Sequence, residues 1–243
     1  MNVPPQKPDG KSEKLAKFMA RCGVASRRVC EQYIRARWVE VDGEIVSTPE
    51  TRIVPDQQKV VVRGKLITPP DTFRYILLNK PTGIICTCKP SREKGKTILD
   101  LVTVSERVFP VGRLDKNTSG LILLTNDGEL AQRLTHPSFG KEKEYLITTK
   151  RPLGEDDLEK LRKGVQLEDG LSRFTSVQKL GENSLKVVMT EGRNRQIRRT
   201  LKALRIPIKN LHRTRFGDLT LSELPRGKWR DLTLEEIERL KSE

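Results

Sequence analysis

Apolar residues recur with a helical period near the start of the chain. The first such set is Leu15, Phe18, Met19 and Cys22. Ser12 precedes this set as a candidate helix cap, and Gly23 follows it as a stop signal. After a second candidate cap at Ser26, the same 3.6-residue period continues through Val29, Cys30, Tyr33 and Ile34. We therefore predict two short amphipathic helices, one after Ser12 and one after Ser26.

A period of two replaces the helical period over residues 38–46 and 59–67. The first stretch alternates around Asp42-Gly43, a pair typical of tight hairpins. The segment "TPPDT" that follows has two prolines and predicts a stiff linker over 68–73. We therefore predict a small helix-and-sheet unit over residues 11–67. The Pro-rich, polar residues 1–10 precede it, and we expect them to be a disordered leader.

Short strands and helices alternate irregularly through residues 74–243. Strand patterns cover residues 75–81, 108–112, 120–127, 143–149 and 184–190. Helical patterns cover residues 128–136, 154–165 and 191–204. The Lys-rich stretch 89–96 predicts an exposed loop. Because the regular βα repeat of a doubly wound fold is missing, we predict an α+β domain with a mixed or antiparallel central sheet.

Charge narrows the class of partner. The 243 residues include 47 Lys and Arg against 32 Asp and Glu, a net charge of +15. Nine of these cations and no acid lie between Gly192 and Phe216. Such an excess favours a polyanionic partner, with nucleic acid first.

Metal, membrane and secretion signals are missing from the sequence. The four cysteines and two histidines form no metal-ligand spacing, and no apolar run of about 18 residues occurs. There is no signal-peptide pattern either. We therefore expect a cytoplasmic protein with reduced thiols, no metal and no membrane contact.

The N-terminal unit is similar to the S4-type alpha-L RNA-binding domain. The turn "GVASRR" at residues 23–28 and the hairpin "VEVDGEIV" at 39–46 carry this resemblance. Arg27 and Arg28 are candidate phosphate contacts near a helix N-terminus. The alternative is that they are solvated residues at the start of a helix.

Asp115 is the best candidate for a reactive carboxylate. It lies in a polar turn before the apolar run 121–124, so a buried strand can hold it in position. An Asx-turn residue is the alternative. No phosphate loop, dinucleotide fingerprint, catalytic triad or HExxH motif occurs. Any chemistry would therefore use carboxylate, Tyr and Arg side chains.

Five segments in order extend this picture. They are "LNKPTGI", "GRLDKNTSGLILLTNDGELAQRL", "EKEYLI", "EGRNRQIRRTL" and the S4-type unit before them. Together they resemble the RsuA/RluB/RluE/RluF family of ribosomal RNA pseudouridine synthases, from Lys14 to about Leu232. The resemblance implies isomerisation of a uridine in ribosomal RNA without a cofactor or metal. It also implies a central mixed or antiparallel sheet crossed by an active-site cleft.

The resemblance assigns roles to individual residues. Asp115 matches the catalytic aspartate, Tyr145 the active-site tyrosine, and Arg198 the arginine that pairs with the aspartate. Ile197 matches the apolar residue that helps wall the pocket. We expect further substrate contacts from Lys80, Arg113, Arg193, Arg195 and Arg199. An aspartate could attack C1′ of the ribose or remove the C2′ proton, and the sequence leaves both routes open.

The sequence leaves alternatives open for the target RNA and for the class of function. Segments "THPS" and "GVQLEDG" look closer to the RluB branch, whereas "DKNTSG" and "EKEYL" also fit RluF, so we favour 23S over 16S ribosomal RNA. A non-catalytic rRNA-binding or ribosome-assembly factor is the alternative function, and a DNA-binding regulator is weaker because no helix-turn-helix or finger pattern occurs. We expect a monomer.

Overall fold

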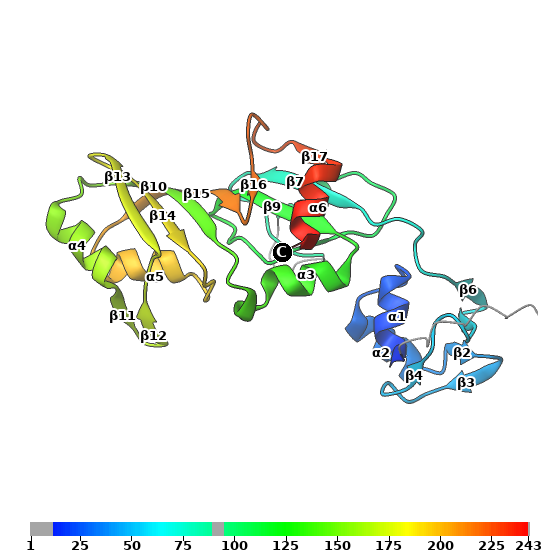
Figure 1. Ribbon diagram of the computed structural model, residues 1–243. Helices are drawn as coiled ribbons and strands as arrows, with labels where there is room; N and C mark the ends of the chain where they lie inside the picture. Colours follow the sequence, from blue (N-terminus) through cyan, green and yellow to red (C-terminus); the bar gives the residue numbers. More distant parts are fainter. Residues whose placement is uncertain (1–11, 89–94, 243) are drawn as a thin grey trace, which may run out of the picture. The chain divides into compact units, whose positions relative to one another are not determined.

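Figure 1 shows a computed structural model that describes residues 12–88 and 95–242. The predicted leader 1–10 and residues 89–94 of the predicted Lys-rich loop lie outside the described residues. The chain divides into two compact units, one ending at Phe73 and the other beginning at Arg74. Each unit has its own apolar core. No helix in the described ranges is long and apolar enough to cross a membrane.

The first unit packs two helices against a small sheet. The helices are α1 (Leu15–Arg21) and α2 (Arg27–Arg35). The strands are β2 (Val39–Val41), β3 (Glu44–Val46), β5 (Val60–Val62) and β6 (Lys65–Ile67), in the order β3-β2-β5-β6. The predicted hairpin is confirmed: Asp42 and Gly43 both have positive φ, at 53° and 89°, as its tight turn requires. Alternate strand residues turn inward onto the helices, so one face of the sheet forms the core.

The predicted cap at Ser12 is wrong, whereas the cap at Ser26 is confirmed. Helix α1 begins at Leu15, because the two residues before it form strand β1 (Glu13–Lys14) against β4 (Arg52–Ile53). Ser12 instead accepts a hydrogen bond from Arg52 Nε at 3.0 Å. The Ser26 hydroxyl accepts the backbone N–H of Val29 at 3.4 Å. Glu13 and Lys14, which the local pattern assigns to the start of a helix, are therefore part of a strand.

The second unit is built on a large mixed sheet, as predicted. Its order is β13-β14-β10-β15-β9-β7-β17, with β16 beside β15 and β8 beside β9. Only β9 and β15 pair in parallel among these described strands. The strands are β7 (Tyr75–Lys80), β8 (Phe109–Pro110), β9 (Ser119–Thr125), β10 (Lys143–Thr149), β13 (Ser176–Gly181), β14 (Ser184–Met189), β15 (Ile208–Phe216), β16 (Leu219–Thr220) and β17 (Trp229–Asp231).

Both faces of the central strands are covered. Every residue of β7 and β9 is buried, so their apolar runs show no alternation in the sequence. Ile122 and Leu124 pack into one core cluster, and Leu121 and Leu123 pack into the cluster on the other face. The second cluster includes side chains of α3 (Gly128–Thr135) and α6 (Leu234–Ser242). The first includes side chains of α4 (Glu155–Lys163) and α5 (Gln196–Ala203).

Short elements complete the unit. The 3-10 helices are η1 (Ile98–Asp100) and η2 (Pro137–Phe139). A separate hairpin consists of β11 (Val165–Leu167) and β12 (Gly170–Ser172), and it lies beside α5. This hairpin was not predicted from the sequence, because the predicted helix over 154–165 includes Val165, the first residue of β11.

Candidate active site

A row of paired residues crosses the centre of the sheet. Tyr145 of β10 pairs with Arg213 of β15, which pairs with Gly120 of β9, which pairs with Lys80 of β7. Paired residues on neighbouring strands lie on the same face of a sheet. Four segments that are far apart in the sequence therefore meet along one line, next to the turn that carries Asp115.

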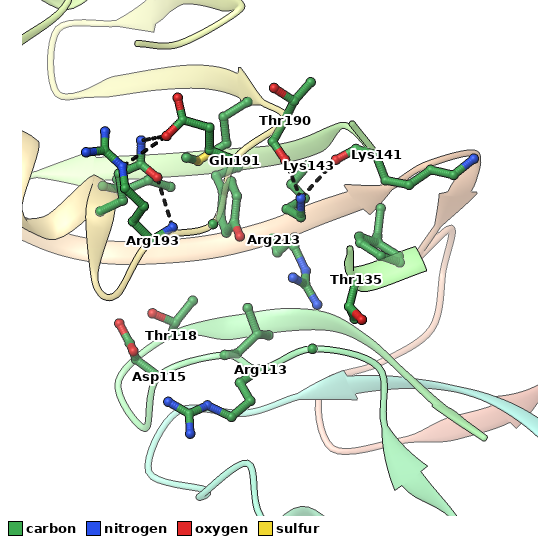
Figure 2. Close-up of a pocket in the computed structure, with 18 of the residues that line it drawn as sticks. Arg113, Asp115, Thr118, Thr135, Lys141, Lys143, Thr190, Glu191, Arg193 and Arg213 are labelled. Carbon is green, nitrogen blue, oxygen red and sulfur yellow. Dashed lines mark hydrogen bonds and ion pairs between the residues drawn. The ribbon is translucent and has the colours of Figure 1, made fainter. Parts of the chain in front are cut away.

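A pocket of about 460 Å³ opens beside this row (Figure 2). Strands β10 and β15, the turn at 111–118, the end of α3 and the start of α5 contribute to its wall. Seven of the residues predicted for the site line it, namely Arg113, Asp115, Tyr145, Arg193, Arg195, Ile197 and Arg198. Tyr145 and Ile197 are 8% and 5% exposed and belong to the apolar part of the wall.

Asp115 and Arg198 form an ion pair at the pocket. Arg198 Nε lies 3.7 Å from Asp115 Oδ2. The same guanidinium donates through Nη2 to the Asn117 carbonyl at 2.7 Å and to the Thr118 hydroxyl at 3.2 Å. Burial lowers the pKa of Arg198 from its usual value, and the Asp115 carboxylate opposes that shift. Arg198 therefore holds both the carboxylate and the turn that carries it.

Lys80 supports the turn that carries Asp115 through its buried ammonium group and is not available to a phosphate. Its side chain is fully buried, and Nζ lies within 3.4 Å of the carbonyl oxygens of Pro81, Asp115, Lys116 and Thr118. Burial lowers its pKa to about 8. The prediction of Lys80 as a substrate contact is wrong, because its strand is covered on both faces and the backbone carbonyls of the turn take the ammonium group.

Replacement of Lys80 tests this supporting role. We expect Lys80→Met to lower the free energy of unfolding by about 2 kcal/mol, because several buried carbonyls lose their donor. Urea unfolding measures the change, with Lys209→Met, an exposed residue on β15, as the matched control. Equal stabilities of the Lys80 and Lys209 variants would contradict the role.

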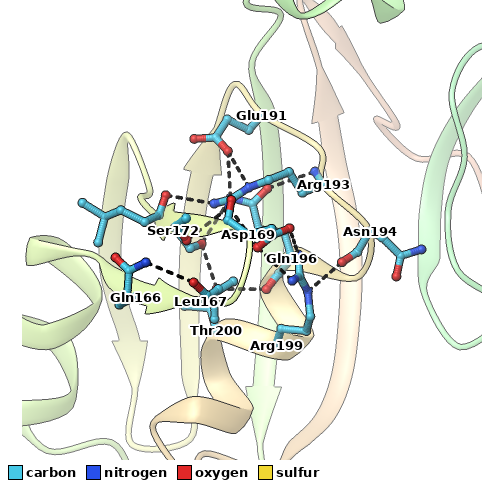
Figure 3. A network of polar contacts seen from close by, with 12 residues as sticks. Gln166, Leu167, Asp169, Ser172, Glu191, Arg193, Asn194, Gln196, Arg199 and Thr200 are labelled. Carbon is cyan, nitrogen blue, oxygen red and sulfur yellow. Dashed lines mark hydrogen bonds and ion pairs between the residues drawn. The ribbon is translucent and has the colours of Figure 1, made fainter.

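Arg199 lies outside the lining of the pocket and belongs to a polar network (Figure 3). Its guanidinium makes two hydrogen bonds to the Asp169 carboxylate, at 2.9 and 2.6 Å. These bonds lower the pKa of Asp169. Asp169 also accepts from Arg193 Nη1 at 3.0 Å, and Glu191 forms an ion pair with Arg193 at the same distance. Carboxylates on the chain itself thus offset the charges of Arg193 and Arg199.

The rest of this network anchors helix α5 to the β11–β12 hairpin. Gln196 donates to the Ser172 hydroxyl at 3.1 Å, and Ser172 lies 2.8 Å from the Thr200 hydroxyl. All three side chains are buried. Arg195, which precedes the helix, has a left-handed φ of 48° and is exposed at the pocket. Anchoring of α5 in this way holds Ile197 and Arg198 in place. Arg27 and Arg28 belong to the other unit, where both are exposed at the start of α2.

Sequence reasoning missed three cations of the pocket wall, Lys141, Lys143 and Arg213. A signal for Lys143 was present, because it stands two residues before Tyr145 on the same strand and so shares its face. Arg213 was counted only as one of many cations. Its position became informative once β15 was known to lie between β9 and β10. In the described residues, no group of three or more His, Cys, Asp or Glu could hold a metal ion.

Comparisons with known proteins agree with these two units. Residues 74–203 match the family model for RNA pseudouridylate synthase, and residues 13–59 match the S4 domain model. A protein of Mycobacterium leprae named as an uncharacterized RNA pseudouridine synthase is 40% identical over 95% of this chain and 93% of its own. Ribosomal large subunit pseudouridine synthase B of Vibrio cholerae is 40% identical over 89% of this chain and 70% of its own. A crystal structure of a pseudouridylate synthase covers 93% of this chain and 99% of its own, with a TM-score of 0.68 and 32% identity.

Proposed function

Because this chain belongs to the RNA pseudouridylate synthase family and carries an S4 domain, we propose that it isomerises one uridine of large-subunit ribosomal RNA to pseudouridine. Family membership makes the chain an isomerase of RNA uridine. The finer choice of large-subunit RNA is supported by relatives named as ribosomal large subunit pseudouridine synthase B, in Vibrio cholerae and Haemophilus influenzae. We also propose that it acts in the cytoplasm, where bacterial ribosomal RNA is made.

The observation that carries the proposal is the meeting of Asp115, Tyr145, Ile197 and Arg198 at one pocket. The Asp115 side chain remains 30% exposed although Arg198 pairs with it, so a substrate atom can still reach the carboxylate. The ion pair, together with the bonds from Arg198 to Asn117 and Thr118, therefore holds the Asp115 carboxylate in position at the pocket.

The reaction breaks the bond between N1 of uracil and C1′ of the ribose, and forms a bond from C5 to C1′. Asp115 either attacks C1′ and leaves when C5 bonds there, or removes the C2′ proton and returns it. C5 loses its proton at the end, and N1 gains one. Atoms and electrons therefore balance within the substrate, and we propose that no cofactor or metal takes part.

Tyr145 and Ile197 would hold the base after its glycosidic bond breaks. The Tyr145 ring offers a flat surface on which uracil can stack, and Ile197 forms the apolar wall beside it. The target uridine must leave its helix to reach this pocket, which costs roughly a few kcal/mol. We propose that phosphate contacts from Arg113 and Arg195 at the pocket, and from Arg27 and Arg28 of the S4 domain, offset that cost.

Mapping of pseudouridines tests the function. Both large ribosomal RNAs are mapped in cells that lack this gene and carry either the wild-type gene or the Asp115→Asn form. We expect one position in 23S RNA to lose pseudouridine and only the wild type to restore it. If every pseudouridine persists in the deletion strain and the purified protein binds rRNA without modifying it, the chain is a non-catalytic rRNA-binding or assembly factor.

A conservative change at Arg198 tests how the carboxylate is held. We expect Arg198→Lys to lower kcat about 10²-fold, because one ammonium cannot reach Asp115, Asn117 and Thr118 in the fork geometry of a guanidinium. Steady-state kinetics on an RNA hairpin with the mapped uridine measures kcat. The control is Arg162→Lys, at an exposed position on α4 and outside the pocket lining. Similar kcat values for both variants would contradict this role of Arg198.

A further inference from the structure

Lys143 and Arg213 form a cluster of two cations in the wall of the pocket, which we call the cation pair (Figure 2). Arg213 lies opposite Tyr145 in the strand pairing, and Lys143 lies opposite Phe216. Both cations approach the ring of Phe216: Arg213 Cζ lies 5.3 Å and Lys143 Nζ 5.9 Å from its centroid. The two side chains therefore share one corner of the pocket, between Tyr145 and Phe216.

No acid offsets the cation pair within the described residues. Lys143 Nζ donates to the carbonyls of Lys141 at 2.9 Å and Thr190 at 2.7 Å, and Arg213 Nε donates to the Leu121 carbonyl at 2.8 Å. The two acids that line the pocket are engaged elsewhere, because Asp115 pairs with Arg198 and Glu191 pairs with Arg193. Arg193 and Arg199, by contrast, share the Asp169 carboxylate.

Arg213 also has an unused donor. The side chain is only 3% exposed, and its Nη2 is buried without a hydrogen-bond partner among the residues that the structure describes. A buried donor left without a partner costs about 1–3 kcal/mol, and an uncompensated buried charge costs more. Burial, followed by the nearby charge of Arg213, lowers the pKa of Lys143 to about 8. This corner of the pocket therefore offers positive charge and a free hydrogen-bond donor, which an anion can satisfy.

We propose that the cation pair binds a phosphodiester group next to the uridine that enters the pocket. This inference rests on the proposed function and adds the part of the nucleotide that the pair recognises. A neutral carbonyl of uracil would satisfy the Arg213 donor but would leave the two positive charges uncompensated. A phosphodiester supplies both the acceptor oxygens and the negative charge.

The position of the cation pair gives the contact a function beyond affinity. Arg213 and Tyr145 are neighbours in one cross-strand pair, so a phosphate held by Arg213 lies beside the ring that supports the base. The sugar between base and phosphate is then held at two points. We infer that the cation pair positions the ribose relative to Asp115, and that it selects an extruded nucleotide of RNA over free uridine.

The first test compares small ligands and requires neither turnover nor a mapped target. Calorimetry measures Kd for uridine 3′,5′-bisphosphate and for uridine. We expect the bisphosphate to bind the wild type at least about tenfold more tightly than uridine, since charge-assisted hydrogen bonds are the strongest kind. Arg213→Gln and Lys143→Gln should each lose most of this preference. Arg162→Gln, an exposed cation on α4, should keep it.

The second test places the contact within RNA. A neutral methylphosphonate replaces, one at a time, the phosphates on either side of the uridine in the mapped hairpin, and Kd is measured with the Asp115→Asn protein. One replacement should weaken binding about tenfold in that protein and have no further effect when Arg213→Gln is added. Independent losses in the two backgrounds would overturn the proposal, as would an unchanged preference for the bisphosphate in both Gln variants.

Folding and function are separated by two further measurements. Thermal unfolding verifies each variant, and Arg213→Lys keeps the charge if Arg213→Gln does not fold. Lys143→Gln then carries the test on its own, because its amide can still donate to the Lys141 or Thr190 carbonyl. If no pseudouridine forms but the charge-dependent binding is present, the function fails and the anion site stands. If pseudouridine forms without that binding, only the anion site fails.

Discussion

Asp115→Asn is expected to lower kcat at least about 10³-fold and to leave the Kd for RNA within about threefold. Asparagine has the same shape, and the backbone bond from Thr118 N–H to the Asp115 carbonyl is unaffected. The amide can neither attack C1′ nor accept the C2′ proton, so both routes are closed. Steady-state kinetics on the mapped hairpin measures kcat, and filter binding measures Kd.

The control for this prediction is Asp218→Asn. Asp218 is an exposed residue in the turn between β15 and β16 and lies outside the pocket lining, so its substitution should leave kcat unchanged. If Asp115→Asn turns over at a rate close to that of Asp218→Asn, Asp115 is a turn residue and the chemistry lies elsewhere. A parallel loss of RNA binding would instead point to misfolding of the turn.

Gly120→Ala is expected to lower the free energy of unfolding by about 5 kcal/mol. Gly120 has a φ of 111°, which side-chain-bearing residues rarely adopt. A Cβ there would lie 2.2 Å from the Arg213 carbonyl oxygen and 2.6 Å from the Arg213 nitrogen. Both atoms belong to the backbone of a paired strand, so β9 and β15 would have to separate. The Arg213 side chain would move with its strand and distort the pocket.

Gly128→Ala is the matched control for Gly120→Ala. Gly128 is the first residue of α3, its φ is not positive, and a Cβ there has no atom within 4 Å. Alanine at this position should leave stability unchanged or raise it by a few tenths of a kcal/mol. Urea unfolding followed by circular dichroism compares the two. A Gly120 variant as stable as the Gly128 variant would contradict the close approach of β9 and β15.

Much of the fold follows from patterns that are local in the chain. The helix after Ser26 forms as its cap and apolar period predict, and the helical pattern over 128–136 forms α3. In the structure Asp127 caps α3 by accepting the backbone N–H groups of Glu129 and Leu130. The Asp42-Gly43 hairpin also forms as predicted. The exception is the start of α1, where β1 pairs with β4 about 40 residues away. Here the pairing of β1 with a distant strand overrides the local preference for a helix start at Ser12. That pairing cannot be predicted from the residues around Ser12 alone.

Some residues of the candidate site could be predicted from local motifs, and others could not. The motifs around Asp115, Tyr145, Ile197 and Arg198 indicated residues that meet at the pocket. Each of these residues lies within a short segment that can be identified without knowing the fold. Lys80 was misjudged, since a lysine after an apolar strand looks the same in sequence whether it faces solvent or, as here, backbone carbonyls. Lys143 and Arg213 were passed over as two cations among many. The distribution of charged residues along the sequence does not show which cations form ion pairs with carboxylates in the folded protein.

The sequence by itself determined the class of fold, the S4-type unit and the motifs of a pseudouridine synthase, since these depend on periodicity, turn residues and short segments. Only the tertiary structure decided which side chains share the pocket and which are already paired. The physical reason is the order of strands: β15 lies between β9 and β10, which aligns Tyr145, Arg213, Gly120 and Lys80 in one row. Such long-range pairing sets burial and charge compensation, and no local pattern encodes either.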